Sequence, residues 1–147
     1  MRASKTISLL FLIFVLGLIS GLALGTLRTE YRVQNVSTIK TLGVGVYYDQ
    51  NCTMQVASID WGILERSSCA TKTVYSKSLS NVDVTLHVYA DYWDPPECEQ
   101  YMALTANPNN ATVQPKEAVM ISLTLNIAHN ITDITTFSFD IVFLGRG

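Results

Sequence analysis

The sequence contains few of the residues on which most catalytic and metal sites depend. Its 147 residues include two histidines, His87 and His129, and three cysteines, Cys52, Cys69 and Cys98. No two cysteines have the Cys-x-x-Cys spacing that is typical of zinc and redox sites. The sequence also lacks a Gly-x-Ser-x-Gly elbow, a phosphate-binding glycine loop and a His-Glu-x-x-His motif. We therefore expect no enzyme activity, no cofactor and no metal ligands.

An excess of positive charge is also absent. Ten basic and 12 acidic side chains give a formal net charge of −2, and the two signs are interspersed along the chain. Proteins that bind nucleic acids concentrate lysine and arginine in a patch that neutralises phosphates. The charge balance therefore argues against a nucleic-acid partner.

One loop combines acidic and aromatic side chains and is therefore a candidate binding site. Alternating carboxylates in a loop can bind a hard cation through their oxygens, but we interpret this cluster as a solvated loop between strands. We interpret the aromatic residues beside it as packing residues rather than a recognition patch. The acidic residues are Asp91, Asp94, Glu97 and Glu99, and the aromatic residues are Tyr89, Tyr92, Trp93 and Tyr101.

The sequence does contain one long apolar stretch, which is uncharged from Thr6 to Leu27 and has basic residues on both sides. A helix of this length rises about 33 Å, enough to cross a hydrocarbon core of about 30 Å. We interpret residues 1–27 as a single transmembrane anchor. A cleaved signal peptide is the alternative, because Ala23-Leu24-Gly25 resembles a small-x-small cleavage site; cleavage would make the protein secreted.

Three glycines in this stretch, Gly17, Gly21 and Gly25, are spaced four residues apart and so share one helical face. Small residues at this spacing let transmembrane helices approach closely. The face is a candidate site for helix pairing. Self-association is therefore expected through either this helix or an exposed strand.

Features of the remaining chain predict that it faces the outside of the cell. Asn-x-Ser/Thr acceptor patterns for glycosylation begin at four asparagines: Asn35, Asn51, Asn110 and Asn130. In an exported protein, three cysteines favour one disulfide and one leftover thiol. Any of the three pairings is open, and so is the alternative that all three are small buried side chains.

From residue 42 onward, apolar residues recur with a period of two, which is typical of β-strands. No helix is expected after the N-terminal segment. The pattern predicts an all-β domain over residues 42–147, an immunoglobulin-like antiparallel β-sandwich of about seven strands. Residues 28–41 are expected to be an extended linker or a first strand. The runs fall at residues 42–48, 58–64, 71–79, 82–90, 101–106, 119–127 and 137–143. The residues predicted to face inward include Leu86, Val88, Leu123, Leu125, Phe139 and Ile141.

Three of these runs carry a family resemblance. Ile59-Asp60-Trp61-Gly62-Ile63-Leu64, Thr71 to Leu79 and Asn81 to Leu86 resemble a module of archaeal surface proteins. That module is similar to the immunoglobulin-like domains of the major-sperm-protein and Hydin type. The resemblance extends over residues 42–145 and implies the fold, but it says little about function.

The chain departs from the module at three places, one of which is Gln114-Pro115-Lys116-Glu117, where the usual glycine is absent. Glu65-Arg66-Ser67-Ser68 stands where the module has a Pro-Gly turn, and Ser76 and Lys77 stand where it has apolar residues. The functional hypothesis is a noncatalytic, membrane-anchored extracytoplasmic domain with a structural or adhesive role. The alternative is a processed subunit of a surface filament, in which residues 29–42 complete the sheet of a neighbouring subunit.

Overall fold

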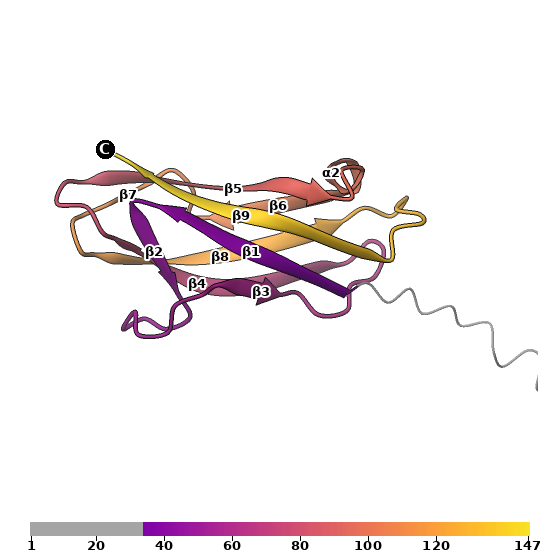
Figure 1. The fold of residues 1–147 in the computed structure, drawn as a ribbon, viewed down its shortest axis with the longest axis horizontal. Helices are drawn as coiled ribbons and strands as arrows, with labels where there is room; N and C mark the ends of the chain where they lie inside the picture. Colours follow the sequence, from indigo (N-terminus) through magenta and orange to yellow (C-terminus); the bar gives the residue numbers. More distant parts are fainter. Residues whose placement is uncertain (1–33) are drawn as a thin grey trace, which may run out of the picture. The chain divides into compact units, whose positions relative to one another are not determined.

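The alternating runs form two β-sheets that pack face to face in a computed structural model, which describes residues 34–147 (Figure 1). The first sheet has the strand order β3 (Ser58–Asp60), β1 (Gln34–Leu42), β9 (Thr136–Arg146), β5 (Val84–Asp94) and β7 (Ala111–Val113). The second has the order β2 (Val44–Tyr47), β4 (Cys69–Ser78), β8 (Ala118–Ile127) and β6 (Met102–Asn107). The prediction of an all-β sandwich is confirmed, with nine strands in the described residues instead of about seven.

The predicted membrane segment and the candidate helix-pairing residues Gly17, Gly21 and Gly25 lie outside the described residues. Within residues 34–147, no helix has the length and apolar character needed to span a membrane.

The predicted strand over residues 42–48 is in fact parts of two strands in different sheets. Leu42 ends β1 in the first sheet, and Val44 begins β2 in the second. Gly43 makes the change of sheet with a φ of +74°, a conformation that glycine adopts without a steric penalty. A Cβ at this position would also lie 3.2 Å from the carbonyl oxygen of Gly145. Alternation continues in the sequence across the break, so the period alone does not reveal it.

A single-turn helix, α2 (Cys98–Tyr101), corrects the expectation that no helix follows the N-terminal segment. Pro95 and Pro96 precede it, and their carbonyl oxygens accept hydrogen bonds from the N–H groups of Cys98 (3.0 Å) and Glu99 (3.2 Å). Proline is compatible with a helix start because the first N–H groups have no partner within the helix.

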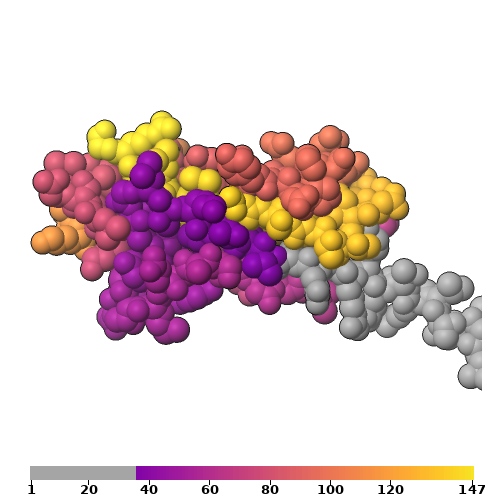
Figure 2. All heavy atoms as spheres, viewed as in Figure 1, coloured from indigo at the N-terminus to yellow at the C-terminus, as the bar shows by residue number. Residues whose placement is uncertain are grey.

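Strand β1 is an interior strand of the first sheet. It pairs in parallel with β9 over nine positions, from Gln34 opposite Thr136 to Leu42 opposite Leu144. Its other edge pairs antiparallel with β3. In Figure 2 the indigo atoms of β1 lie beside the yellow atoms of β9. Residues 34–42 are therefore paired with β9 along their whole length, and residues 36–38 are paired with β3 as well.

The core lies between the sheets, on the phase that the alternation predicts. All six residues predicted to face inward are at most 5% exposed. Phe139 is 2% exposed, and its ring stacks on Trp93 at 4.2 Å, Phe137 at 6.2 Å and Trp61 at 6.3 Å between centroids. This aromatic cluster fills the end of the sandwich at which β1 begins. The inward prediction for these six residues is confirmed.

Candidate functional site

The histidines lie apart from the other residues able to bind metals. His87 is half-buried on β5, opposite Leu144 of β9, and His129 is exposed in the turn after β8. Within residues 34–147, no group of three or more histidine, cysteine, aspartate or glutamate side chains is arranged to hold a metal ion.

The acidic cluster is spread over two elements. Asp91 and Asp94 lie on β5 on either side of a register shift, where Tyr92 has a φ of +51°. The Tyr92 N–H donates to Asp91 Oδ1 at 2.9 Å. Glu97 precedes α2 and Glu99 lies within it, and all four carboxylate side chains are exposed. This dispersal gives no set of oxygens converging on one point.

The aromatic residues beside this loop divide into two pairs. Trp93 stacks on Phe139, and Tyr101 is half-buried against the core. Tyr89 is 44% exposed and Tyr92 is 76% exposed. The interpretation as packing residues is therefore right for Trp93 and Tyr101 and wrong for the two exposed tyrosines. The bulge at Tyr92 turns its side chain away from the core.

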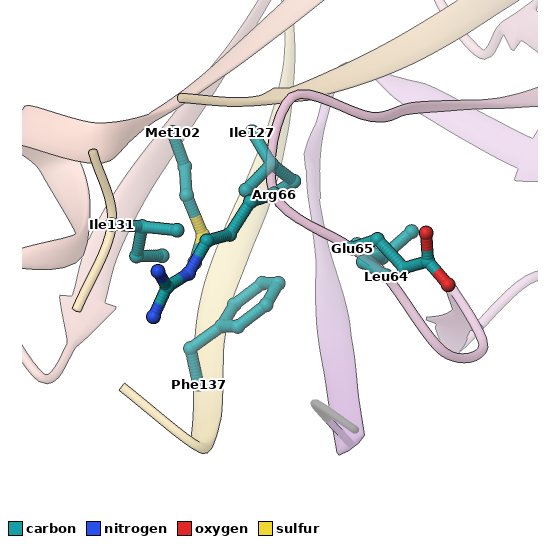
Figure 3. A pocket seen from close by; sticks show the side chains of 7 residues that line it. All are labelled: Leu64, Glu65, Arg66, Met102, Ile127, Ile131 and Phe137. Carbon is teal, nitrogen blue, oxygen red and sulfur yellow. The ribbon is translucent and has the colours of Figure 1, made fainter. Parts of the chain in front are cut away.

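A small apolar pocket opens near the aromatic cluster (Figure 3). Its interior of about 10 Å³ is close to the lower limit for a single water molecule. In Figure 3 the Arg66 side chain lies across the pocket, close to Met102 and Ile131. A substrate does not fit in this space. The lining residues are Leu64, Glu65, Arg66, Met102, Ile127, Ile131 and Phe137.

The three cysteines of the candidate disulfide are free in the structure and lie on separate segments. Cys52 is half-buried in the loop after β2, Cys69 is exposed at the start of β4, and Cys98 is buried on α2. Burial, together with the nearby carboxylates of Glu97 and Asp94, raises the pKa of the Cys98 thiol to about 11. The thiolate is the reactive form, so Cys98 is protected both sterically and electrostatically.

This difference predicts how many thiols react in the folded protein. At pH 8, a thiol reagent should modify Cys52 and Cys69 in the native full chain, while Cys98 should react only after unfolding in denaturant. Counting modified thiols by intact mass checks this result. The Cys98→Ser variant is the control and should give the same native count as the wild type. Modification of Cys98 at the rate of Cys69 would contradict the burial of Cys98.

The glycosylation acceptor patterns differ in the surroundings of the serine or threonine hydroxyl group that each contains. The pattern at Asn35 uses Ser37, which is fully buried. In the pattern at Asn51, the Thr53 hydroxyl donates to Asp49 Oδ2 at 2.7 Å. The N–H of Met54 and the hydroxyl of Thr53 both donate to Asp49 and hold the pKa of its carboxyl below the usual value. These two hydroxyl groups are engaged in the folded domain.

The patterns at Asn110 and Asn130 are accessible instead. Both asparagines are exposed, as are the hydroxyl-bearing residues Thr112 and Thr132. In the pattern at Asn51, both Asn51 and Thr53 are exposed as well, although the Thr53 hydroxyl is hydrogen-bonded to Asp49.

Comparisons with known proteins give no family to which these features could be assigned. No family model matches the chain, and no curated protein is significantly similar to it.

Proposed function

We propose that this protein is a noncatalytic, membrane-anchored extracytoplasmic domain of immunoglobulin-like type with a structural or adhesive role. The observation that carries the proposal is the uncharged stretch from Thr6 to Leu27, placed directly before a β-sandwich. A stretch of this length is typical of a membrane-spanning helix.

The chemistry of the sandwich supports a role without catalysis. An active site needs acid, base or nucleophilic groups within hydrogen-bonding reach of one another. In residues 34–147, the two histidines are separate and the buried thiol of Cys98 has a raised pKa. A surface that binds another molecule does not need such groups.

An adhesive role is supported by the end of the sandwich opposite the start of β1. Three large aliphatic side chains are exposed there: Leu42 at 67%, Leu79 at 63% and Val82 at 54%. The N–H of Leu79 donates to the Gly43 carbonyl at 3.1 Å, which brings two of these segments together. Contiguous patches of exposed apolar side chains are typical of interaction surfaces.

The strand-exchange alternative has less support. It depends on residues 29–42 being free to enter a neighbouring sheet. Residues 34–42 pair with β9 and residues 36–38 also pair with β3 of their own chain, and exchange would first have to break these pairings.

Topology is tested by labelling thiols on intact cells that express the full chain. A membrane-impermeant maleimide should reach Cys69, which is exposed. The control is a chain with Ser4→Cys and all three native cysteines replaced by serine, which should be labelled only after permeabilisation. Labelling of Cys69 only after permeabilisation would overturn the extracytoplasmic proposal. The intact mass of the native protein distinguishes an uncleaved anchor from a cleaved signal peptide.

A further inference from the structure

The edge strands of the two sheets differ in length. In the described residues, β3 and β7 have three residues each, β2 has four and β6 has six. The outer backbone groups of an edge strand are a template for pairing with another strand, and proteins block long edges by recognisable means. The longest edge strand, β6, is therefore the one to compare with the protected edges.

The free edge of β5 beyond β7 is blocked by a side chain. Asn109 Oδ1 accepts a hydrogen bond from the Val88 N–H, and Asn109 Nδ2 donates to the Val88 carbonyl, both at 2.9 Å. The amide group thereby takes the place of a residue in a neighbouring strand. Farther along β5, the bulge at Tyr92 interrupts the ladder. Bulges of this kind discourage further pairing.

The free edge of β4 beyond β2 is blocked by a charge. Lys72 lies opposite Leu123 of β8, on the phase that faces the core, yet it is exposed. β2 pairs with β4 only from Tyr75 to Ser78, so Lys72 lies on a part of β4 that β2 does not cover. A charged residue on the inward phase of an edge strand disfavours a new neighbouring strand, which would bury the charge.

Strand β6 has none of these protections. Its sequence Met-Ala-Leu-Thr-Ala-Asn contains no charge and no proline, and its pairing with β8 has no register shift. Leu104 and Ala106, on the inward phase, are only half-buried. The edge is therefore uncharged, regular and open.

The hydrogen bond that joins Tyr101 to Ala128 shows which β6 groups point outward. The Ala128 N–H donates to the Tyr101 carbonyl at 2.8 Å, so Tyr101 and Ala128 are a hydrogen-bonded pair. The next pair along the ladder is Met102 opposite Ile127. In an antiparallel ladder, hydrogen-bonded and non-bonded pairs alternate. The backbone groups of Leu104 and Ala106 and the carbonyl of Met102 therefore point away from β8, toward the free edge. The Met102 N–H instead donates to the Cys98 carbonyl of α2.

We propose that β6 pairs antiparallel with β6 of a second copy of this chain, which joins the two four-stranded sheets into one continuous sheet. Leu104 lies opposite its own counterpart, and Met102 lies opposite Ala106 of the second copy. This register uses the N–H and carbonyl of Leu104, the N–H of Ala106 and the carbonyl of Met102, and it forms about four hydrogen bonds. The proposal goes beyond the proposed function, since it does not depend on where the domain resides.

The outer face of the second sheet explains why the partner is a second copy. Thr71, Thr124 and Thr105 form a row across β4, β8 and β6, with 3.0 Å between Oγ1 of Thr71 and Oγ1 of Thr124. The neighbouring residues on β8 and β6 are uncharged as well, so two copies meet without charge repulsion. A two-fold interface uses the same patch on both subunits. The uncharged edge of β6 can pair with a copy of itself without repulsion, and it offers no charge that would attract a different strand.

The test measures the oligomeric state of the full chain in detergent micelles by analytical ultracentrifugation. We expect a concentration-dependent dimer for the wild type. Ala106→Pro removes an outward-pointing N–H, which an edge strand tolerates, and should weaken the dimer by roughly tenfold or more. Ala106→Lys places on β6 the kind of inward charge that β4 carries at Lys72, and it should have the same effect. Thr73→Lys, on the outer face of β4, is the matched control and should leave the dimer unchanged.

Hydrogen exchange on the wild type provides a readout that needs no variant. The amides of Leu104 and Ala106 should exchange rapidly when the protein is dilute and slowly when it is concentrated. The amides of Thr105 and Asn107, which face β8, should be protected at both concentrations. A wild type that remains monomeric, or a dimer that is unchanged in both Ala106 variants, would overturn the proposal. Concentration-independent exchange at Leu104 and Ala106 would overturn it too.

Discussion

Phe139→Ala should lower the free energy of unfolding by about 3–5 kcal/mol, the largest effect expected for a single substitution in this domain. Phe139 is 2% exposed and stacks on Trp93 with a centroid distance of 4.2 Å. Its ring also contacts the rings of Trp61 and Phe137. Removing the ring leaves a cavity that the stiff aromatic neighbours cannot close. The loss of stability therefore includes both the transfer free energy of the removed atoms and the cost of the cavity. Urea unfolding followed by tryptophan fluorescence measures the change.

Ser138→Ala is the matched control for this substitution. Ser138 is the preceding residue on β9, and its side chain is exposed on the opposite face. A substitution at such a position changes stability by about 0.5 kcal/mol or less. Equal losses for the two variants would show that β9 does not present Phe139 to the core.

Ser37→Ala should destabilise the domain by about 1–3 kcal/mol, although it removes only one oxygen atom. Ser37 is fully buried on β1, and its Oγ accepts a hydrogen bond of 2.7 Å from Trp61 Nε1. Trp61 is 3% exposed. Without the hydroxyl, the indole N–H stays buried without this acceptor and loses its hydrogen bond to water as well. Equilibrium unfolding in urea gives the difference from the wild type.

Ser76→Ala is the comparison that separates a satisfied hydroxyl from an unsatisfied one. Ser76 is 1% exposed, and its Oγ is buried without a hydrogen-bond partner. Its removal relieves a desolvation cost and should be neutral or stabilising by up to about 1 kcal/mol. A loss at Ser76 as large as that at Ser37 would contradict the assigned hydrogen bond. Trp61→Phe in the Ser37→Ala background should then cost less than in the wild type, because the shared bond is already absent.

The positions of the main strands could be predicted from the sequence because the signal is local. In β8, Ile121, Leu123 and Leu125 alternate with polar residues, and all three are fully buried. A strand with one buried face must place every second side chain inward. The short strand β7 was missed because three residues, Ala111–Val113, are too few to show a period.

The division of the chain between two sheets could not be predicted in the same way. Leu42, Val44 and Val46 continue one alternating pattern, but the positive φ of Gly43 sends them to different sheets. Glycine is common in turns, bulges and strands, so its identity does not specify which of these it forms. Only the pairing of β1 with β9 and of β2 with β4 decides which sheet each of these segments joins.

The candidate sites show the same limit. The sequence identifies which side chains are capable of chemistry, such as Cys98 and Asp94, but not their surroundings. Whether the Cys98 thiol is protected depends on burial and on the carboxylates of Glu97 and Asp94. Likewise, nothing in the sequence indicates that the amide of Asn109 blocks the edge of β5.

The sequence by itself determined the β-sandwich class and the inward phase of its long strands, because both follow from the period of two along each strand. The tertiary structure decided the strand order, the parallel pairing of β1 with β9 and the open edge of β6. These features depend on contacts between residues far apart in the chain, and such contacts leave no periodic signal in the segments that make them. Alternation sets the face of a strand toward which each side chain points, whereas the competition among all strands for the same backbone hydrogen bonds sets its neighbours.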